Sequence, residues 1–494
     1  MPLINLQIPP GVYRNGTELQ SSGRWYDANL VRWFQGTMRP MGGWRKKSED
    51  QVSGSARAII TWKNNSAEPW VAVGTHSGLY AMRVDGTIKS ITPSGFTSGS
   101  ADAVIKTGYG YSVYGSADYG VERPVTSSEV PATMWTLDTW GEYLVGCSSS
   151  DGKIYEWQLD FTTPTVAAAV TNAPVSNQAV HVTAERIMFA LGAGGNPRKV
   201  AWCDQENNTV WTSTALNQAG EFELATPGTL MAGKRVRGIN LLWTDIDCHA
   251  ATYIGQPFIY SFEKIGSGCG LISRQAVAIA SNVVAFWMSK TGFWMYDGTV
   301  KPLQSDVGDY VFRNMNTSQS SKTYCVHNGE FGEVWWFYPS DQSNEIDRYV
   351  TYNYREGHWN IGSMARTSGT GRGAFDKPLL VSTDGYIYEH EVGFDYGAST
   401  LYAESGPVQM GNGDNVMSVN ELIPDELNQG DVSVTFKTKL YPNGTESTFG
   451  PYSTANPTSV RFSGRQTRLR VDAVKNSNWR VGNMRINVTP SGKR

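Results

Sequence analysis

Short apolar runs separated by polar turns recur along most of this chain. In the clearest example, the apolar run Tyr143–Gly146 leads through the turn Ser148–Gly152 to a second apolar and aromatic run, Ile154–Trp157. Gly152 can adopt a positive φ without a Cβ clash, so Asp151-Gly152 is suited to a tight turn. The β-branched and aromatic residues after it favour an extended strand. This stretch therefore predicts a β-hairpin.

The same order of apolar run, glycine-containing turn and aromatic strand is repeated at 71–82, 284–296 and 379–388. Weaker versions occur at 186–202, 248–262 and 334–353. The turn glycines are separated by loose multiples of about 40 to 50 residues, the length of one four-stranded propeller blade. The repeats predict an all-β fold, a β-propeller of about six or seven blades over residues 51–400. A meander of hairpins in a sandwich or solenoid is the alternative.

Residues 401–494 have a different pattern and predict a separate β-sandwich-like domain. From 432 to 437, Val and Phe alternate with Ser, Thr and Lys, and Tyr441–Gly444 is typical of a hairpin turn. Helical periodicity is weak throughout, and the best helix candidate is 306–315, after a strand at 300–303. The long Gly, Ser and Tyr-rich stretch 94–134 is expected to be an excursion between strands.

Residues 1–50 do not resemble a propeller blade and are predicted to form an extended N-terminal arm for assembly. Arg and Trp alternate within it, and both are enriched at protein interfaces. The arm is expected to dock on a neighbouring subunit, and its removal is expected to leave the propeller folded. Stacking and charge could also bind nucleic acid. The arm residues assigned to the interface are Arg24, Trp25, Arg32, Trp33, Arg39 and Trp44.

Composition narrows the class of protein further. Charged residues are only 18% of the chain and aromatic residues 12%, which suits many short strands and argues against a coiled coil or a disordered chain. The apolar runs are too short to cross a bilayer, and residues 1–14 lack the features of a cleaved signal, so no membrane insertion is expected. The five cysteines are scattered and indicate free thiols in a reducing cytosol.

Charge is unevenly distributed along the chain. Residues 431–494 carry a net charge of +8 and the remaining residues −11, so the C-terminal domain should have a basic face. The arginines that alternate with apolar residues there are predicted to share one exposed face and to contact acidic surface on a neighbouring protein. They are Arg461, Arg468, Arg470 and Arg485. Weak binding to duplex DNA is expected.

The sequence contains no catalytic signature that we recognise. P-loop, nucleophile-elbow and zinc-protease motifs are missing, and no set of residues suggests a metal or cofactor site. Asp245 and Asp247 could point to one face of a strand as a glycosidase pair. Such carboxylates can also cap turns or bond to backbone, and without a second cluster of carboxylates this role is favoured. We therefore expect a protein that is not an enzyme, without catalytic, metal or cofactor residues.

Both ends of the chain resemble tail proteins of short-tailed bacteriophages. At the N-terminus the resemblance lies in Trp25-Tyr26-Asp27, Leu30–Trp33, Arg39-Pro40 and Gly42-Gly43-Trp44. At the C-terminus it lies in Val460–Arg468, Trp479–Gly482 and Pro490–Arg494. These motifs are similar to those of the tail nozzle or tail hub proteins, also called packaged-DNA stabilisation proteins.

The resemblance implies a structural component of the virion tail, assembled in the host cytoplasm. Such proteins form a ring, usually of six copies, below the portal and adaptor, and contact tail fibre, spike or needle proteins. The ring retains packaged double-stranded DNA and forms part of the channel through which it is ejected. No catalytic residues come with the resemblance. The alternative function is a glycan-binding or glycan-cleaving propeller for host recognition, in which aromatic turns such as Phe293-Trp294 and Trp335-Trp336 stack on sugars.

Overall fold

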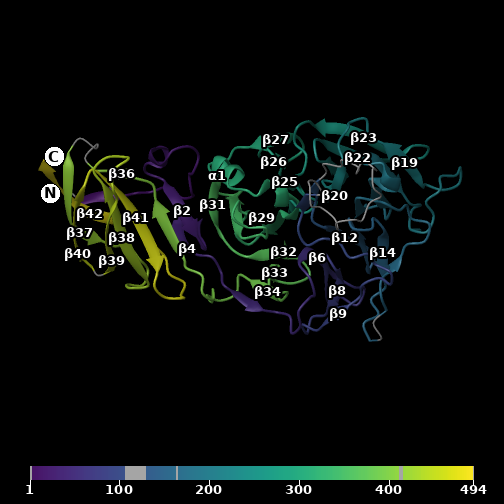
Figure 1. Ribbon diagram of the computed structural model, residues 1–494, viewed down its shortest axis with the longest axis horizontal. Coiled ribbons are helices and arrows are strands. Elements are labelled where there is room, and N and C mark those ends of the chain that lie inside the picture. The colour runs from purple at the N-terminus through teal and green to yellow at the C-terminus, as the bar shows by residue number, and fades with distance from the viewer. Residues whose placement is uncertain (1–2, 106–128, 163–164, 411–414, 455, 493–494) are drawn as a thin grey trace, which may run out of the picture.

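The protein consists of a β-propeller and a β-sandwich that lie side by side in an elongated molecule (Figure 1). The computed structural model describes residues 3–105, 129–162, 165–410, 415–454 and 456–492. Part of the predicted excursion at 94–134 lies outside the described residues. Both ends of the described chain lie in the sandwich, so the propeller is formed by the middle of the sequence.

Seven four-stranded antiparallel sheets form the described part of the propeller, and we call each of them a blade. The first four blades comprise β6 (Ala56–Lys63), β7 (Pro69–Thr75), β8 (Gly78–Met82) and β9 (Ile88–Ser90); β12 (Trp135–Trp140), β13 (Tyr143–Ser148), β14 (Ile154–Trp157) and β15 (Ala168–Ala169); β16 (Ala179–Val182), β17 (Met188–Leu191), β18 (Lys199–Trp202) and β19 (Gly220–Glu223); and β20 (Leu230–Val236), β21 (Ile239–Thr244), β22 (Cys248–Gly255) and β23 (Ile259–Gly266).

Three more such sheets belong to the described part of the propeller. They comprise β24 (Val277–Ala280), β25 (Val284–Met288), β26 (Phe293–Tyr296) and β27 (Val300–Leu303); β28 (Tyr324–Asn328), β29 (Glu333–Tyr338), β30 (Arg348–Asn353) and β31 (His358–Ser363); and β32 (Arg366–Thr370), β33 (Leu379–Ser382), β34 (Ile387–His390) and β5 (Trp44–Lys46). The first strand of the last blade packs beside that of the first, β32 against β6.

The repeated hairpins predicted from the sequence are pairs of strands within these blades. The four clear repeats are β7–β8, β13–β14, β25–β26 and β33–β34, and the weaker ones are β17–β18, β22–β23 and β29–β30. Gly152 has a φ of 64° at the end of its turn, as the tight-turn prediction requires. The prediction of a β-propeller is confirmed, and the hydrophobic pattern was sufficient because each hairpin is local in sequence.

The few helices are short. The predicted helix at 306–315 is confirmed as α1 (Gly308–Arg313), directly after strand β27. The described residues also include three short 3-10 helices and two two-stranded sheets outside the blades and the sandwich sheets: η1 (Glu18–Ser21), η2 (Ala193–Gly195), η3 (Thr317–Lys322), β3 (Val31–Phe34) with β4 (Thr37–Pro40), and β10 (Val104–Ile105) with β11 (Glu129–Val130). Within the described residues, no helix is both long and apolar enough to span a membrane.

The sandwich consists of two antiparallel sheets. One contains β1 (Leu3–Leu6), β42 (Met484–Gly492), β37 (Val416–Ile423) and β40 (Thr458–Gly464), and we call it the outer sheet. The other contains β2 (Trp25–Asn29), β35 (Tyr402–Ser405), β41 (Gln466–Ala473), β38 (Val432–Lys439), β39 (Ser447–Ser453) and β36 (Val408–Gln409), and we call it the inner sheet. Their alternating apolar residues face each other, as Val434, Phe436 and Phe462 do, so the predicted strand alternation is confirmed.

The prediction of a separate N-terminal arm is wrong. Residues 1–50 supply β1 and β2 to the sandwich, the hairpin β3–β4 between the two parts, and β5 to the last blade. Trp25 and Trp33 are buried in the chain's own core, with ring centroids 5.6 Å apart. Deleting residues 1–50 would therefore remove five strands, including the fourth strand of the last blade, so the truncated propeller should not remain intact. The arm could not be recognised from local sequence because its strands pair with residues more than 300 positions away.

Paired aromatic residues illustrate how the blades pack. Trp335 and Trp336 point to opposite faces of β29, yet both are buried, at 4% and 0% exposure. Trp336 stacks on Trp359, and Trp335 stacks on Tyr349. These two tryptophans therefore belong to the core and cannot stack on a sugar.

We predict that all five cysteines are free and unreactive in the native protein. All of them are buried without a disulfide, and burial raises the pKa of Cys147 and Cys203 to about 12 and that of Cys269 to about 11. Because the thiolate is the reactive form, alkylation of the folded protein should be slow. Mass spectrometry after alkylation in denaturant without reductant should find five modified cysteines, whereas one or three would reveal a disulfide.

Candidate functional site

The hairpin β3–β4 lies between the sandwich and the propeller, and it carries a buried arginine. Arg32 donates through Nε and Nη2 to the two carboxylate oxygens of Glu333, at 3.0 and 2.9 Å, and through Nη1 to Glu391 at 2.9 Å. Its guanidinium also lies over the ring of Phe331, 3.7 Å from the centroid. The three charged side chains are at most 4% exposed. One arginine therefore connects the hairpin to two neighbouring blades.

The carboxylates around Arg32 are themselves well bonded. Trp335 Nε1 donates to Glu333 at 2.8 Å, and Gly42 N and Asn328 Nδ2 donate to Glu391 at 2.9 and 3.0 Å. Burial alone would lower the pKa of Arg32, but the two carboxylates outweigh it and raise the pKa above its usual value. Arg32 thus stays charged and is not available to a partner protein.

The other N-terminal residues assigned to an interface also contact their own chain. Arg24 forms an ion pair with Asp306 at 3.1 Å, and Arg39 lies over Phe34. Trp44 packs against His390 and lies under the guanidinium of Arg366. These contacts show how the sequence pattern of Arg and Trp is used: it attaches the N-terminal segment to the propeller and the sandwich.

The four C-terminal arginines do not share one face, so that prediction is wrong. Arg468 and Arg470 lie on β41 of the inner sheet, and Arg461 and Arg485 lie on β40 and β42 of the outer sheet. The sequence correctly predicted that these arginines alternate with apolar residues along their strands. Such alternation determines the face of a sheet on which a side chain lies, but it does not determine which sheet the strand joins.

Arg468 and Arg470 find their acidic partners within the chain. Glu404 on β35 lies 3.3 Å from Arg470 and also pairs with Arg468, and Lys437 adds a third cation at 2.9 Å. Glu18 of η1 bonds to Arg468 at 2.9 Å, and Asp472 bonds to Arg470. Burial alone would raise the pKa of Glu404, but these cations outweigh it and lower the pKa.

Arg461 and Arg485 remain exposed on the outer sheet. Neither has an ion-pair partner among the described residues. Arg485 borders a cavity of about 440 Å³ with Asn5, and Arg461 borders one of about 320 Å³ with Glu421. Of the ten assigned residues, these two are the ones whose charge is directed to solvent.

Asp245 and Asp247, the possible glycosidase pair, have a structural role. They follow strand β21 in a turn, where Asp245 accepts a hydrogen bond from Thr229 N at 2.7 Å and Asp247 accepts one from Gly268 N at 3.2 Å. Within the parts of the chain that are described, no group of three or more His, Cys, Asp or Glu side chains is placed to bind a metal ion.

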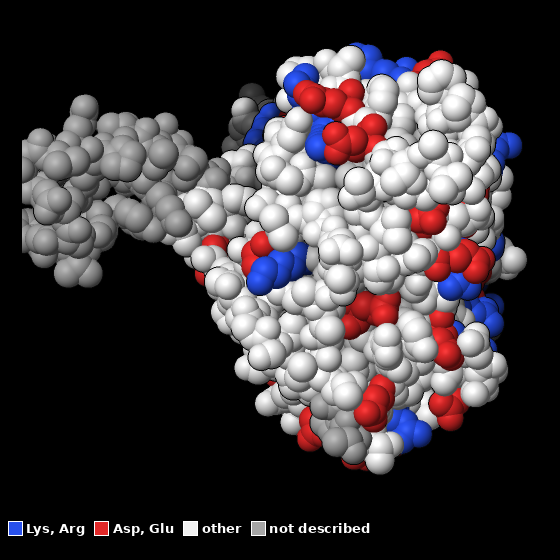
Figure 2. Space-filling model, turned by 90° about the vertical axis from the view of Figure 1, so that its right-hand side faces the viewer, with Lys and Arg blue, Asp and Glu red and all other residues white. Residues whose placement is uncertain are grey.

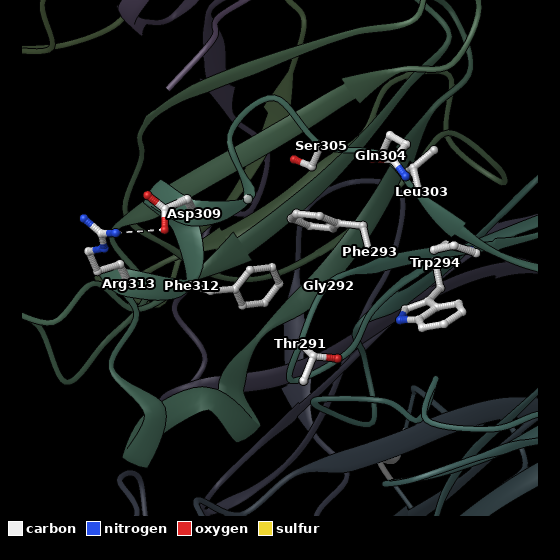
Figure 3. Close-up of a pocket in the computed structure, with 12 residues that line it drawn as sticks. Thr291, Gly292, Phe293, Trp294, Leu303, Gln304, Ser305, Asp309, Phe312 and Arg313 are labelled. Carbon is white, nitrogen blue, oxygen red and sulfur yellow. Dashed lines mark hydrogen bonds and ion pairs between the residues drawn. The ribbon is translucent and has the colours of Figure 1, made fainter. Parts of the chain in front are cut away.

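An open groove of about 590 Å³ lies between α1 and the hairpin β26–β27 (Figure 3). Its lining combines aromatic and aliphatic residues with a polar rim. The residues are Thr291, Gly292, Phe293, Trp294, Pro302, Leu303, Gln304, Ser305, Gly308, Asp309, Phe312 and Arg313. Phe293-Trp294, which the sequence placed in an aromatic turn, lies on strand β26, and the residues of α1 could not be associated with it by sequence alone.

Comparisons with known proteins assign the chain to no family. No family model and no curated protein matches the chain. A streptogramin B lyase is similar with a TM-score of 0.43 and 7% identity, over 70% of this chain and 96% of the lyase. A catalytically inactive virginiamycin B lyase from Staphylococcus aureus, with quinupristin, has a TM-score of 0.35 and 8% identity, over 55% and 91%. The likeness concerns fold alone.

We predict that replacing Arg32 with Met strongly destabilises the protein. The change leaves two buried carboxylates without their cation, which should lower the free energy of unfolding by about 3–5 kcal/mol. Urea unfolding followed by tryptophan fluorescence would measure it. Arg45→Met, which removes a 69% exposed partner of Glu389, is the control and should cost less than about 1 kcal/mol. Adding Glu333→Gln and Glu391→Gln to Arg32→Met should recover stability; equal effects of the two arginine variants would contradict this account.

We also predict a pH-dependent effect of Glu404→Gln. Because the folded-state pKa of Glu404 is lowered, its contribution to stability is present above its unfolded pKa of about 4.3 and is lost as the pH falls through the folded value. Calorimetry should show a larger loss of melting temperature for the variant at pH 7 than at pH 3. The exposed Glu49→Gln is the control and should show little change at either pH. A loss that is equal at both pH values would rule out this charge effect.

Proposed function

We propose that this chain is a structural component of the tail of a short-tailed bacteriophage. In this role several copies, six by the resemblance, form a ring-shaped nozzle or hub below the portal and adaptor. The ring retains packaged DNA and forms part of the ejection channel. It would contact the adaptor above and fibre, spike or needle proteins at its other surfaces, in a virion assembled in the host cytoplasm.

The observation that carries the proposal is that the two resembling segments fold against each other. Met38 and Val481 form a reciprocal pair of backbone hydrogen bonds, of 3.3 and 3.0 Å, between opposite ends of the chain. Trp25 borders the same small cavity as Leu469 and Val481. Two stretches recognised separately in the sequence are thus one structural unit, which supports a common origin for the resemblance at both ends.

The distribution of charge also supports a conduit rather than a DNA-binding protein. The basic residues of the inner sheet are neutralised by Glu18, Glu404 and Asp472 of the same chain. On the end of the propeller that faces away from the sandwich, acidic and basic side chains are few and intermixed (Figure 2). Counterion release from phosphates requires a series of Lys and Arg contacts, and that face shows no continuous basic track.

Arg461 and Arg485 are the positions that we assign to contact with a neighbouring copy or tail protein. They are exposed on the outer sheet, and neither has an ion-pair partner among the described residues. An acidic surface on the neighbour would pair with them, and such charge pairs favour correct orientation during assembly.

We predict that the purified protein forms rings with a central hole in negative-stain micrographs. Arg461→Glu/Arg485→Glu should reduce the ring fraction by about tenfold, because like charges would then face each other across the contact. The melting temperature should be unchanged since both side chains are exposed. Lys63→Glu/Lys153→Glu reverses two exposed charges on the propeller and is the matched control.

A monomer or a compact trimer without a hole would contradict the proposed function. Rings that form equally well in the double arginine variant would leave the function intact but contradict the assignment of this contact. The two results are distinguishable in the same set of micrographs, with sedimentation velocity to measure the fraction assembled.

A further inference from the structure

The groove between α1 and the hairpin β26–β27 has a half-buried aromatic lining. Phe293 is buried at its base, and its ring lies 5.4 Å from that of Phe312 on α1, toward which it points (Figure 3). Trp294 follows Phe293 on the opposite face of the strand and pairs across the hairpin with Pro302. Trp294 and Phe312 both line the groove and are partly exposed.

The rim of the groove is polar but carries no net charge. Asp309 and Arg313, one turn apart on α1, form an ion pair at 3.0 Å with side chains 39% and 71% exposed. Thr291 and Gln304 are exposed on the hairpin side. A carboxylate, a guanidinium, an amide and a hydroxyl therefore offer both donors and acceptors around an aromatic surface.

The walls of the groove are held in place by the rest of the chain. Asn15 donates to Ser305 O at 2.6 Å and accepts from Asp309 N at 3.0 Å, so the N-terminal segment fixes the start of α1. Trp359 Nε1 donates to Gln304 O at 2.9 Å and fixes the other wall. A groove that is formed before binding loses little conformational entropy when a ligand enters.

We infer that this groove binds a neutral pyranose sugar. The C–H face of a pyranose ring is apolar and packs on an aromatic surface, whereas its hydroxyl groups both donate and accept hydrogen bonds. The adjacent carboxylate and guanidinium of Asp309 and Arg313 match a pair of neighbouring hydroxyls. A volume of about 590 Å³ lies within the range of about 300–1,000 Å³ for small-ligand sites.

Ligands of other chemistry fit the groove less well. Asp309 would repel an anion, and Arg313 would repel a cation. A purely apolar ligand would cover both charged groups without replacing their hydrogen bonds to water. Cleavage of the sugar is not part of the inference. Glycoside hydrolysis generally requires two carboxyl groups, and Asp306, the neighbouring one, is paired with Arg24.

Gly292 allows the groove to be blocked with little disturbance of the fold. A Cβ atom added at this position meets no atom within 4 Å, and Gly292 does not have the positive φ that would make a side chain strained. Gly292→Trp should therefore fill the groove, and Gly292→Ala is the matched control that leaves it open. The inference is independent of the proposed function, since the purified protein binds sugar or does not, whatever its assembly state.

The experiment is saturation-transfer-difference NMR on the full chain with methyl glycosides of glucose, mannose and galactose, each at about 10 mM, above the millimolar affinity expected for small neutral ligands. At least one should receive saturation at its ring C–H protons, and methyl glucuronide should receive less because of its charge. The signal should be lost in Gly292→Trp and kept in Gly292→Ala. Trp294→Ala should weaken binding about tenfold through loss of the stacking surface.

No saturation of any neutral glycoside would overturn the inference. A signal that persists in Gly292→Trp would place sugar binding elsewhere and would also overturn it. Circular dichroism and the melting temperature of Gly292→Trp must match those of Gly292→Ala. If they do not, titration of the wild-type protein and of Trp294→Phe with the glycoside, followed by tryptophan fluorescence, gives the same decision without the bulky variant. Quenching that is lost in Trp294→Phe supports the groove, and unchanged quenching excludes it.

Discussion

The junction between the two parts of the protein depends on one buried arginine. Arg32 brings a positive charge into a place from which water is excluded, and this is tolerated because Glu333 and Glu391 surround the guanidinium with hydrogen bonds. The two carboxylates belong to different blades, so a single side chain fixes the hairpin β3–β4 against both. The positions of β2 in the sandwich and of β5 in the last blade follow, because they flank this hairpin in sequence.

Strands from the first 50 residues complete sheets whose other strands come from much later in the sequence. β5 adds the fourth strand to the last blade, and β1 pairs with β42, so the first 50 residues contribute to four sheets. Neither part can therefore be complete before residues from the start of the chain have met residues from the end. Such long-range pairing is entropically costly, and it links the stability of the sandwich to that of the propeller. The buried aromatic residues of the blades supply much of the apolar surface that offsets this cost.

Much of the positive charge of the C-terminal segment is paired with carboxylates of the same chain. Glu404 is surrounded by Lys437, Arg468 and Arg470, which would repel one another without it. The +8 charge of the C-terminal segment thus says little about binding to nucleic acid, because much of it is compensated in the fold. The exposed charges of Arg461 and Arg485 on the outer sheet and those of Asp309 and Arg313 beside the groove lie in different parts of the molecule. Assembly and ligand binding could therefore act independently.

Sequence alone determined the elements that local patterns encode. Alternating apolar residues and turn glycines, such as Gly152, gave the hairpins of the blades and the strands of the sandwich, because side-chain direction in a strand and turn geometry depend on near neighbours. The short helix after β27 was also predicted from the sequence. The tertiary structure alone decided which strands share a sheet, that Trp25 and Trp33 are core residues, and that Arg468 faces Glu404 while Arg461 faces solvent. It also brought Phe312 to Phe293 to form the groove. These contacts join residues that are distant in sequence, and an Arg or a Trp has the same local pattern whether its partner lies in its own chain or in another.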